Sequence, residues 1–175
     1  WYRPDNATLV IAGRIDPAEV LGKVQATFGP LKNPKSPLPQ APTVEPAQDG
    51  EREVTVRRVG DLNLVAAAYH IPARTHADNA ALSVLANVLG HTPGGRLHRA
   101  LVEPRIAAAA GASAEGLADA GLFTAVAVQQ RSGDAQKMEE VLLAQVERLE
   151  KQPVTAEEVA QAQQRIANAY DLYFT

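Results

Sequence analysis

Proline places the strongest constraint on how this chain can fold. Six of its twelve prolines lie between residues 30 and 50, at Pro30, Pro34, Pro37, Pro39, Pro42 and Pro46. Proline has a fixed φ and no backbone N–H group, so we expect this stretch to be extended over the surface and not helical. The residues before it are too few for a domain of their own. We therefore expect an internal connection within a single domain of 175 residues.

Hydrophobic periodicity divides the rest of the chain into strands and helices. Strands are expected at 7–13, 51–59, 62–71, 107–116 and 121–130. The strand at 62–71 is expected to be central and to form a hairpin with 51–59 around Gly60 and Asp61. The four strands from 51–59 onward come in two pairs with helices between them. This order predicts an α+β class: a two-layer fold with a mainly antiparallel sheet and helices on one face.

Capping signals place the ends of the expected helices. Asp16, followed by Pro17 and Glu19, is typical of a helix start, and Val20, Leu21, Val24 and Phe28 would form its apolar stripe. Thr75 is expected to cap a second helix, and a short helix is expected at about 96–103. The last third is helical on both sides of Pro153, and Thr155 with Glu158 matches a capping box.

Composition and charge exclude several classes of protein. The formal net charge of −3 argues against a nucleic-acid-binding surface, which needs clustered positive charge. The chain has no cysteine, so disulfides, thiol nucleophiles and cysteine zinc ligands are excluded. No apolar run approaches the roughly 18 residues of a membrane span.

The histidines and serines do not form a recognised catalytic motif. His70, His76, His91 and His98 are the four histidines, and none belongs to H-E-x-x-H or its inverted form H-x-x-E-H. His91 and His98 are seven residues apart, but Pro93 and two glycines interrupt the segment between them, which favours a surface histidine pair over a metal site. No serine lies in G-x-S-x-G. We therefore assign no catalytic residue and no metal ligand.

Three residues are candidates for contact with a substrate. Tyr69 and His70 end the strand at 62–71, where they could face a cavity or form only a polar strand end. Arg96 belongs to a basic cluster with Arg99 and Arg105. Such a cluster is either a solvated surface or a contact for a partner or a substrate carboxylate, and both interpretations stay open.

The order of short motifs resembles one protein family over the whole chain. The first segment is similar to Y-x-P-x-N-A-x-L-x-x-x-G followed by a helix and F-G, with matches at Tyr2, Pro4, Asn6, Ala7, Leu9, Gly13, Asp16, Phe28 and Gly29. Further matches follow at 49–58, 69–73, 76–90, 95–103, 121–123 and 155–166. Together these segments resemble the second, non-catalytic domain of pitrilysin/insulinase-type zinc metallopeptidases, the inverzincins.

The resemblance implies an α+β domain that supports a separate catalytic domain. In this family the catalytic domain carries H-x-x-E-H and a distant glutamate, and a zinc-bound water attacks the peptide bond. This chain lacks that motif, so zinc is expected in the preceding domain of the parent protein and not here. Some relatives hold substrate with an arginine and a tyrosine, but Val102 stands at the first position and Ala108 or Ala109 at the second.

The resemblance also implies partners. The expected partners are the upstream catalytic domain of the same polypeptide, from which this chain would be excised, and a peptide substrate enclosed between the two domains. One alternative is a scaffold subunit of a relative that has lost its zinc; another is a stand-alone peptide-binding module. An exposed sheet face would favour self-association. Bacterial relatives are often periplasmic, which gives a compartment only by analogy.

Overall fold

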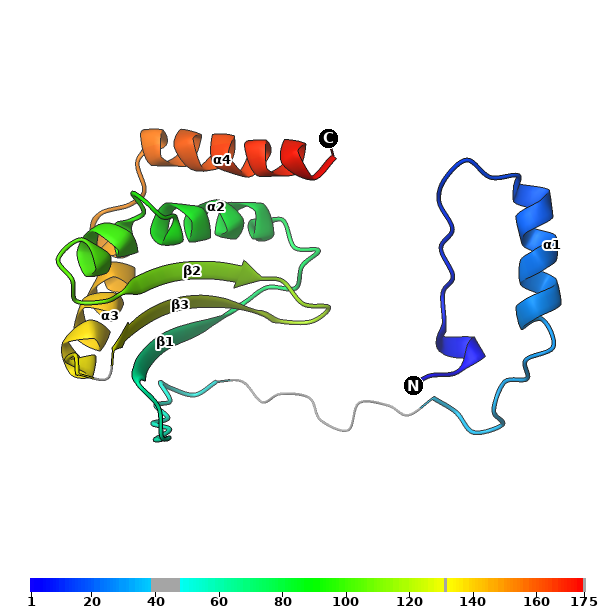
Figure 1. Ribbon diagram of the computed structural model, residues 1–175, viewed down its shortest axis with the longest axis horizontal. Helices are drawn as coiled ribbons and strands as arrows, with labels where there is room; N and C mark the ends of the chain where they lie inside the picture. The colour runs from blue at the N-terminus through cyan, green and yellow to red at the C-terminus, as the bar shows by residue number, and fades with distance from the viewer. Residues whose placement is uncertain (39–47, 131, 175) are drawn as a thin grey trace. The chain divides into compact units, whose positions relative to one another are not determined.

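The computed structural model describes residues 1–38, 48–130 and 132–174 (Figure 1). The chain divides into two units, Trp1–Thr55 and Val56–Thr175, which are considered separately. Of the six clustered prolines, Pro39, Pro42 and Pro46 lie outside the described residues. Residues 31–34, between the first helix and that gap, have no helix or strand, as expected for a proline-rich segment.

The first unit contains one α-helix whose start follows the sequence prediction. Helix α1, Pro17–Phe28, begins after Asp16, whose Oδ1 atom accepts hydrogen bonds from the backbone N–H groups of Ala18 (2.8 Å) and Glu19 (3.3 Å). The helix ends at Gly29, whose N–H group donates to the Gln25 carbonyl. A single 3₁₀ turn, Pro4–Asn6, precedes α1.

The strands expected at 7–13 and 51–59 are not formed, and that prediction is wrong. Neither segment has regular structure in the described residues, so the expected hairpin with 62–71 is also absent. The apolar stripe of α1 has no buried member, and Leu21 is 57% and Phe28 51% exposed. A β-strand exists only through hydrogen bonds to a neighbouring strand, which an apolar sequence pattern alone does not supply.

The second unit is built on a three-stranded antiparallel sheet. Its strands are β1 (Leu62–Ile71), β2 (Ala109–Glu115) and β3 (Gly121–Gln130), in the order β1-β3-β2. Ala66 of β1 and Gly111 of β2 both lie opposite Val126 of β3, which fixes the register. The strand at 62–71 was expected to be central, but it forms an edge, and β3 occupies the centre.

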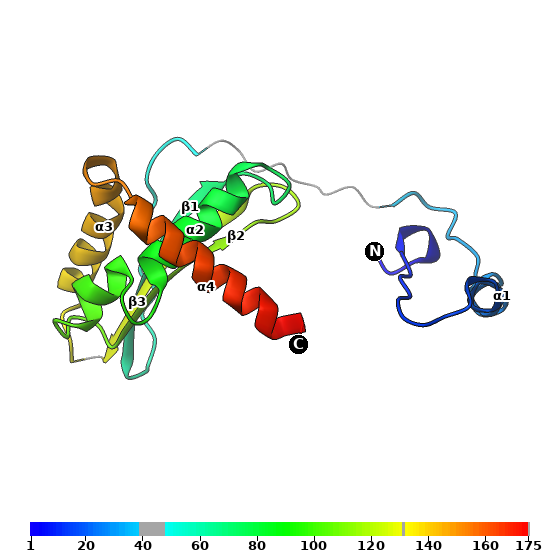
Figure 2. The ribbon, with the colours of Figure 1, turned by 90° about the horizontal axis from the view of Figure 1, so that it is seen from above.

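Helices cover one face of this sheet. They are α2 (Asp78–Gly90), a short π-type helix (His98–Val102), α3 (Ala135–Lys151) and α4 (Ala156–Phe174). Helices α2 and α3 pack on the sheet, whereas α4 lies over α2 on the side away from the sheet, and Figure 2 shows the two helices crossing. Thr75 does not cap α2, since the helix begins only at Asp78 and has no side-chain cap bond.

The core lies between the sheet and these helices. Its largest fully buried side chains are Leu89, Leu97, Leu101, Met138 and Leu142. They pack against Ala125 and Ala127 of the central strand, whose small side chains let the helices approach closely. At Gly90 the approach is closest, because an added Cβ atom would collide with the backbone of Ala112.

Within the described residues of the second unit, no helix packs on the other face of the sheet. Side chains alternate between the two faces of a strand, and the core takes Val65, Ala67, Phe123 and Ala125. The opposite face therefore carries the alternate residues of each strand. We call these residues the open sheet face: Leu64, Ala66, Ala68 and His70 of β1, Leu122, Thr124, Val126 and Val128 of β3, and Ala109, Gly111, Ser113 and Glu115 of β2.

In the described part of the chain, no helix combines the length and the apolar character that crossing a membrane requires.

Candidate functional site

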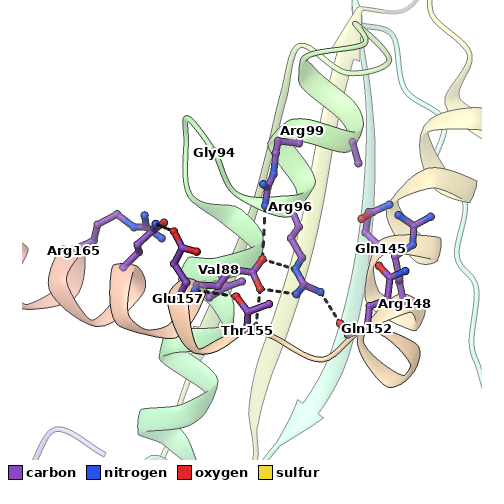
Figure 3. A pocket seen from close by; sticks show the side chains of 13 residues that line it. Val88, Gly94, Arg96, Arg99, Gln145, Arg148, Gln152, Thr155, Glu157 and Arg165 are labelled. Atoms are coloured by element: carbon purple, nitrogen blue, oxygen red, sulfur yellow. Dashed lines mark hydrogen bonds and ion pairs between the residues drawn. The ribbon is translucent and has the colours of Figure 1, made fainter.

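A cavity of about 630 Å³ lies where α2, the short helix, α3 and the start of α4 meet (Figure 3). Its lining is mostly polar. The charged residues in it are four arginines and two glutamates, namely Arg96, Arg99, Arg148, Arg165, Glu157 and Glu158. We call this space the arginine cavity.

Arg96 and Glu158 form the best-connected pair in the cavity. The Nε atom of Arg96 donates to Oε1 of Glu158 (2.8 Å) and Nη2 donates to Oε2 (2.7 Å). Arg96 also donates to the backbone carbonyls of Gln152 (2.8 Å) and Pro153 (3.1 Å), which ties the loop after α2 to the turn between α3 and α4. Two parallel bonds to one carboxylate are the strong form of an arginine contact.

Glu158 has a second role at the start of α4. Its backbone N–H group donates to Oγ1 of Thr155 (3.2 Å), and its Oε2 atom accepts from the Thr155 N–H group (2.9 Å), so the predicted capping box is confirmed. The hydrogen bonds from Arg96, together with those from Thr155, lower the pKa of Glu158 to about 2, although partial burial opposes this change. The carboxylate is therefore ionised at neutral pH.

The other three arginines are less engaged. Arg165 donates from Nε to Oδ1 of Asn87 (2.9 Å), and Nη2 of Arg99 lies 3.7 Å from Oε1 of Glu158. Arg148 has no side-chain hydrogen bond or ion pair within the part of the chain that the structure describes. Burial, and then the positive charge of Arg165, lower the pKa of His91 at the end of α2.

The structure places the three candidate substrate contacts apart. Tyr69 and His70 follow each other on β1, so their side chains point to opposite faces: Tyr69 to the helix side, His70 to the open sheet face. Arg96 follows the C-terminal end of α2 and lines the arginine cavity, which neither Tyr69 nor His70 lines (Figure 3). The three residues therefore do not form one site, and their contact with a substrate stays a prediction.

The sequence patterns did not predict that Arg148 and Arg165 line the arginine cavity. They belong to α3 and α4, and only the packing of these helices puts them beside Arg96 and Arg99. One sequence signal could have indicated part of this site. The capping-box residue Glu158 follows Pro153, which interrupts the helices, and a partly buried ionised glutamate needs a cationic partner.

The described residues contain no group of three or more histidine, aspartate or glutamate side chains close enough to hold a metal ion. His91 ends α2 and His98 lies in the short helix. Neither is fully exposed: both are half-buried, and Nδ1 of His98 is buried without a hydrogen-bond partner in the described structure. The two histidines expected at the surface are thus partly buried.

Comparison with known proteins gives the family. The family model described as the peptidase M16 inactive domain matches residues 1–166. The chain belongs to this family. The pitrilysin/insulinase resemblance read from the sequence motifs is confirmed, and so is the mainly antiparallel α+β fold.

The relatives of this inactive domain include bacterial zinc proteases. It is 30% identical over 162 residues to the zinc protease PqqE of Helicobacter pylori, a match that covers 91% of this chain and 36% of that protein. The crystal structure of a protease from Helicobacter pylori superimposes with a TM-score of 0.85 and 28% identity, over 97% of this chain and 42% of that one. The chain thus spans well under half of each of these relatives.

Two further solved structures extend the comparison. The inactive peptidase domain of a proposed zinc protease from Bordetella parapertussis has a TM-score of 0.60 and 32% identity, over 70% of this chain and 67% of that one. A chain of Complex III2 from Candida albicans has a TM-score of 0.67 at 18% identity, over 90% of this chain and 38% of that one, which shows a shared fold alone.

Proposed function

We propose that this inactive domain packs beside the zinc domain of a metalloendopeptidase and helps to enclose the peptide substrate. The zinc domain, carrying H-x-x-E-H, would supply the metal and the catalytic base, and this domain would supply a wall of the substrate chamber. The proposal is supported by family membership and by the zinc proteases among its relatives.

The observation that carries the proposal is the open sheet face. Three of its four cross-strand rows, Leu64–Val128–Ala109, Ala66–Val126–Gly111 and Ala68–Thr124–Ser113, contain no charged residue, and the fourth, His70–Leu122–Glu115, contains one acidic residue. Leu64 is 65% exposed. An exposed and mostly apolar surface on a folded domain indicates a binding surface for another protein segment.

Of the predicted substrate contacts, His70 fits this geometry most directly. It lies in the fourth row of the open sheet face, opposite Leu122 of β3. Tyr69, on the other face of the strand, and Arg96, bound to Glu158, would act on a substrate only through other residues. We therefore propose His70 as the substrate-facing residue of the three.

The experiment combines the two domains. The zinc domain of the parent protein is purified alone, and its cleavage of an unfolded peptide is measured before and after this chain is added. We expect the added chain to raise the cleavage rate, and Leu64→Lys to weaken that effect. Ala144→Lys adds the same charge at an exposed position of α3, on the helix side of the sheet, and should leave the effect unchanged. An unchanged rate with the unmodified chain would contradict the proposal.

The alternative is a scaffold in a relative that has lost its zinc. A chain of Complex III2 has the same fold, so the fold is compatible with such a role. The sequence of the parent gene over about 250 codons upstream separates the two: an intact H-x-x-E-H supports the protease, and a degenerate motif supports the scaffold. Binding of an extended peptide by this chain without any partner would instead indicate a stand-alone peptide-binding module.

A further inference from the structure

We propose that the arginine cavity binds a multivalent oxyanion, such as a diphosphate or a tricarboxylate, between Arg99, Arg148 and Arg165. This binding is separate from the proposed packing beside a zinc domain, because the cavity lies among the helices and the open sheet face is on the opposite side of the sheet.

The first argument is the concentration of positive charge. Four arginines and two glutamates line the cavity, an excess of two positive charges, in a chain whose formal net charge is −3. A concave site lined by one sign of charge concentrates ions of the opposite sign. Burial is the larger cause of the lowered pKa of His91, and the positive charge of Arg165 adds to it.

The second argument is that most of this charge is not used inside the protein. Arg96 is fully engaged by Glu158 and by two backbone carbonyls. Arg148 makes no side-chain contact of this kind in the described structure, and Arg165 uses only its Nε atom, which leaves its two terminal nitrogens available. Arg99 has one contact with Glu158, at 3.7 Å.

The third argument is the arrangement of these groups. Arg148 comes from α3 and Arg165 from α4, and they enter the cavity from opposite sides, with Arg99 above them (Figure 3). Neutral hydrogen-bonding side chains, Gln145 and Gln161, lie on the same two helices. Guanidinium groups bind planar oxyanions through paired N–H donors, and several around one space favour an anion with more than one charged group.

The cavity volume of about 630 Å³ fits a small ligand. Phosphate and carboxylate oxygens both accept paired hydrogen bonds from an arginine side chain. The proposal therefore includes phosphate and carboxylate ligands, and the experiment distinguishes between them. The probes are inorganic pyrophosphate for phosphate and citrate for carboxylate.

The test measures binding of each probe to the full 175-residue chain by isothermal titration calorimetry at low ionic strength. The variant is Arg148→Gln, which removes an exposed charge without removing a hydrogen bond in the described structure. The matched control is Lys137→Gln, which removes one positive charge from the start of the same helix, outside the cavity lining. Thermal melts of both variants confirm that they remain folded.

We expect at least one probe to bind, and Arg148→Gln to weaken its binding by about fivefold or more while Lys137→Gln changes it by less than about twofold. The tighter of the two probes identifies the phosphate or the carboxylate class. Absence of binding for both probes at millimolar concentration would overturn the proposal. Equal losses in the two variants would also overturn it, because they would show attraction to net charge and not to this cavity.

Discussion

Arg96 and Glu158 lie 62 residues apart in sequence and are joined by two short hydrogen bonds, Nε to Oε1 at 2.8 Å and Nη2 to Oε2 at 2.7 Å. The pair connects the loop after α2 to the first turn of α4. Helix α4 packs mainly on α2. This ion pair and the hydrogen bond from Arg165 to Asn87 therefore attach α4 to the remainder of the second unit.

Glu158→Gln should lower the free energy of unfolding by about 2 kcal/mol at pH 7, because it removes a charged partner of Arg96 while an amide can still cap the helix. The measurement is urea unfolding of the variant and the unmodified chain. Glu157→Gln, a neighbouring exposed glutamate, is the control and should change the free energy of unfolding by less than about 0.5 kcal/mol.

The same pair predicts a pH dependence. The pKa of Glu158 is about 2 in the folded chain, below its ordinary value of 4.5, so its contribution to stability is complete above pH 4.5 and is lost as the pH falls towards 2. The difference in melting temperature between the unmodified chain and Glu158→Gln should shrink over this range. A difference that stays constant from pH 7 to pH 2.5 would show that the carboxylate charge does not act through Arg96.

Gly90→Ala should destabilise the second unit by about 3 kcal/mol, because its Cβ atom would collide with the Ala112 backbone and force α2 away from β2. Gly111→Ala is the matched control, since an added Cβ atom there has no neighbour within 4 Å. That control should be neutral or slightly stabilising, by less than about 1 kcal/mol. Similar chemical-denaturation midpoints for both variants would contradict the close approach of α2 to the sheet.

The open sheet face should make the isolated chain self-associate as its concentration rises. Leu64→Lys places a charge on that face and should shift sedimentation-velocity profiles towards the monomer, whereas Ala144→Lys on the exposed side of α3 should not. A chain that sediments as a monomer at every concentration would contradict the prediction that this surface forms an interface.

The isolated chain should bind no stoichiometric zinc, because the described residues hold no cluster of metal-binding side chains. The measurement is metal analysis after dialysis against buffer with micromolar zinc, with a chelator-treated sample as the reference. One equivalent of zinc retained per chain, together with a chelator-dependent fall in melting temperature, would require a site that includes residues outside the described ranges.

Local signals were enough to predict the helix starts that depend on neighbouring residues. Asp16 caps α1 and Thr155 with Glu158 caps α4, because each cap joins a side chain to backbone groups two or three residues away. Thr75 shows the limit of such signals. The residue before it, Arg74, donates its N–H group to the Leu117 carbonyl, a partner far away in sequence, and the turn that follows is closed by the His76 N–H group on the Ala73 carbonyl, so α2 begins only at Asp78.

The strands were harder to predict because pairing decides them. Three segments pair with one another as antiparallel strands, namely residues 62–71, 109–115 and 121–130. Residues 7–13 and 51–59 have similar apolar patterns but no strand partner among the described residues. An alternating apolar pattern indicates only that the side chains suit a half-buried strand, and it does not identify the neighbouring strand.

The sequence by itself determined the α+β class, the starts of α1 and α4, the family and the absence of its catalytic motif, since all of these depend on residues near one another in the chain. Only the tertiary structure decided that β1 is an edge strand, that Tyr69 lies on the helix side of the sheet and His70 on the open sheet face, and that Arg99, Arg148 and Arg165 share one cavity with the Arg96–Glu158 pair. The physical reason is that these relationships depend on contacts between segments far apart in sequence, which form only when α3 and α4 pack with α2 and the sheet.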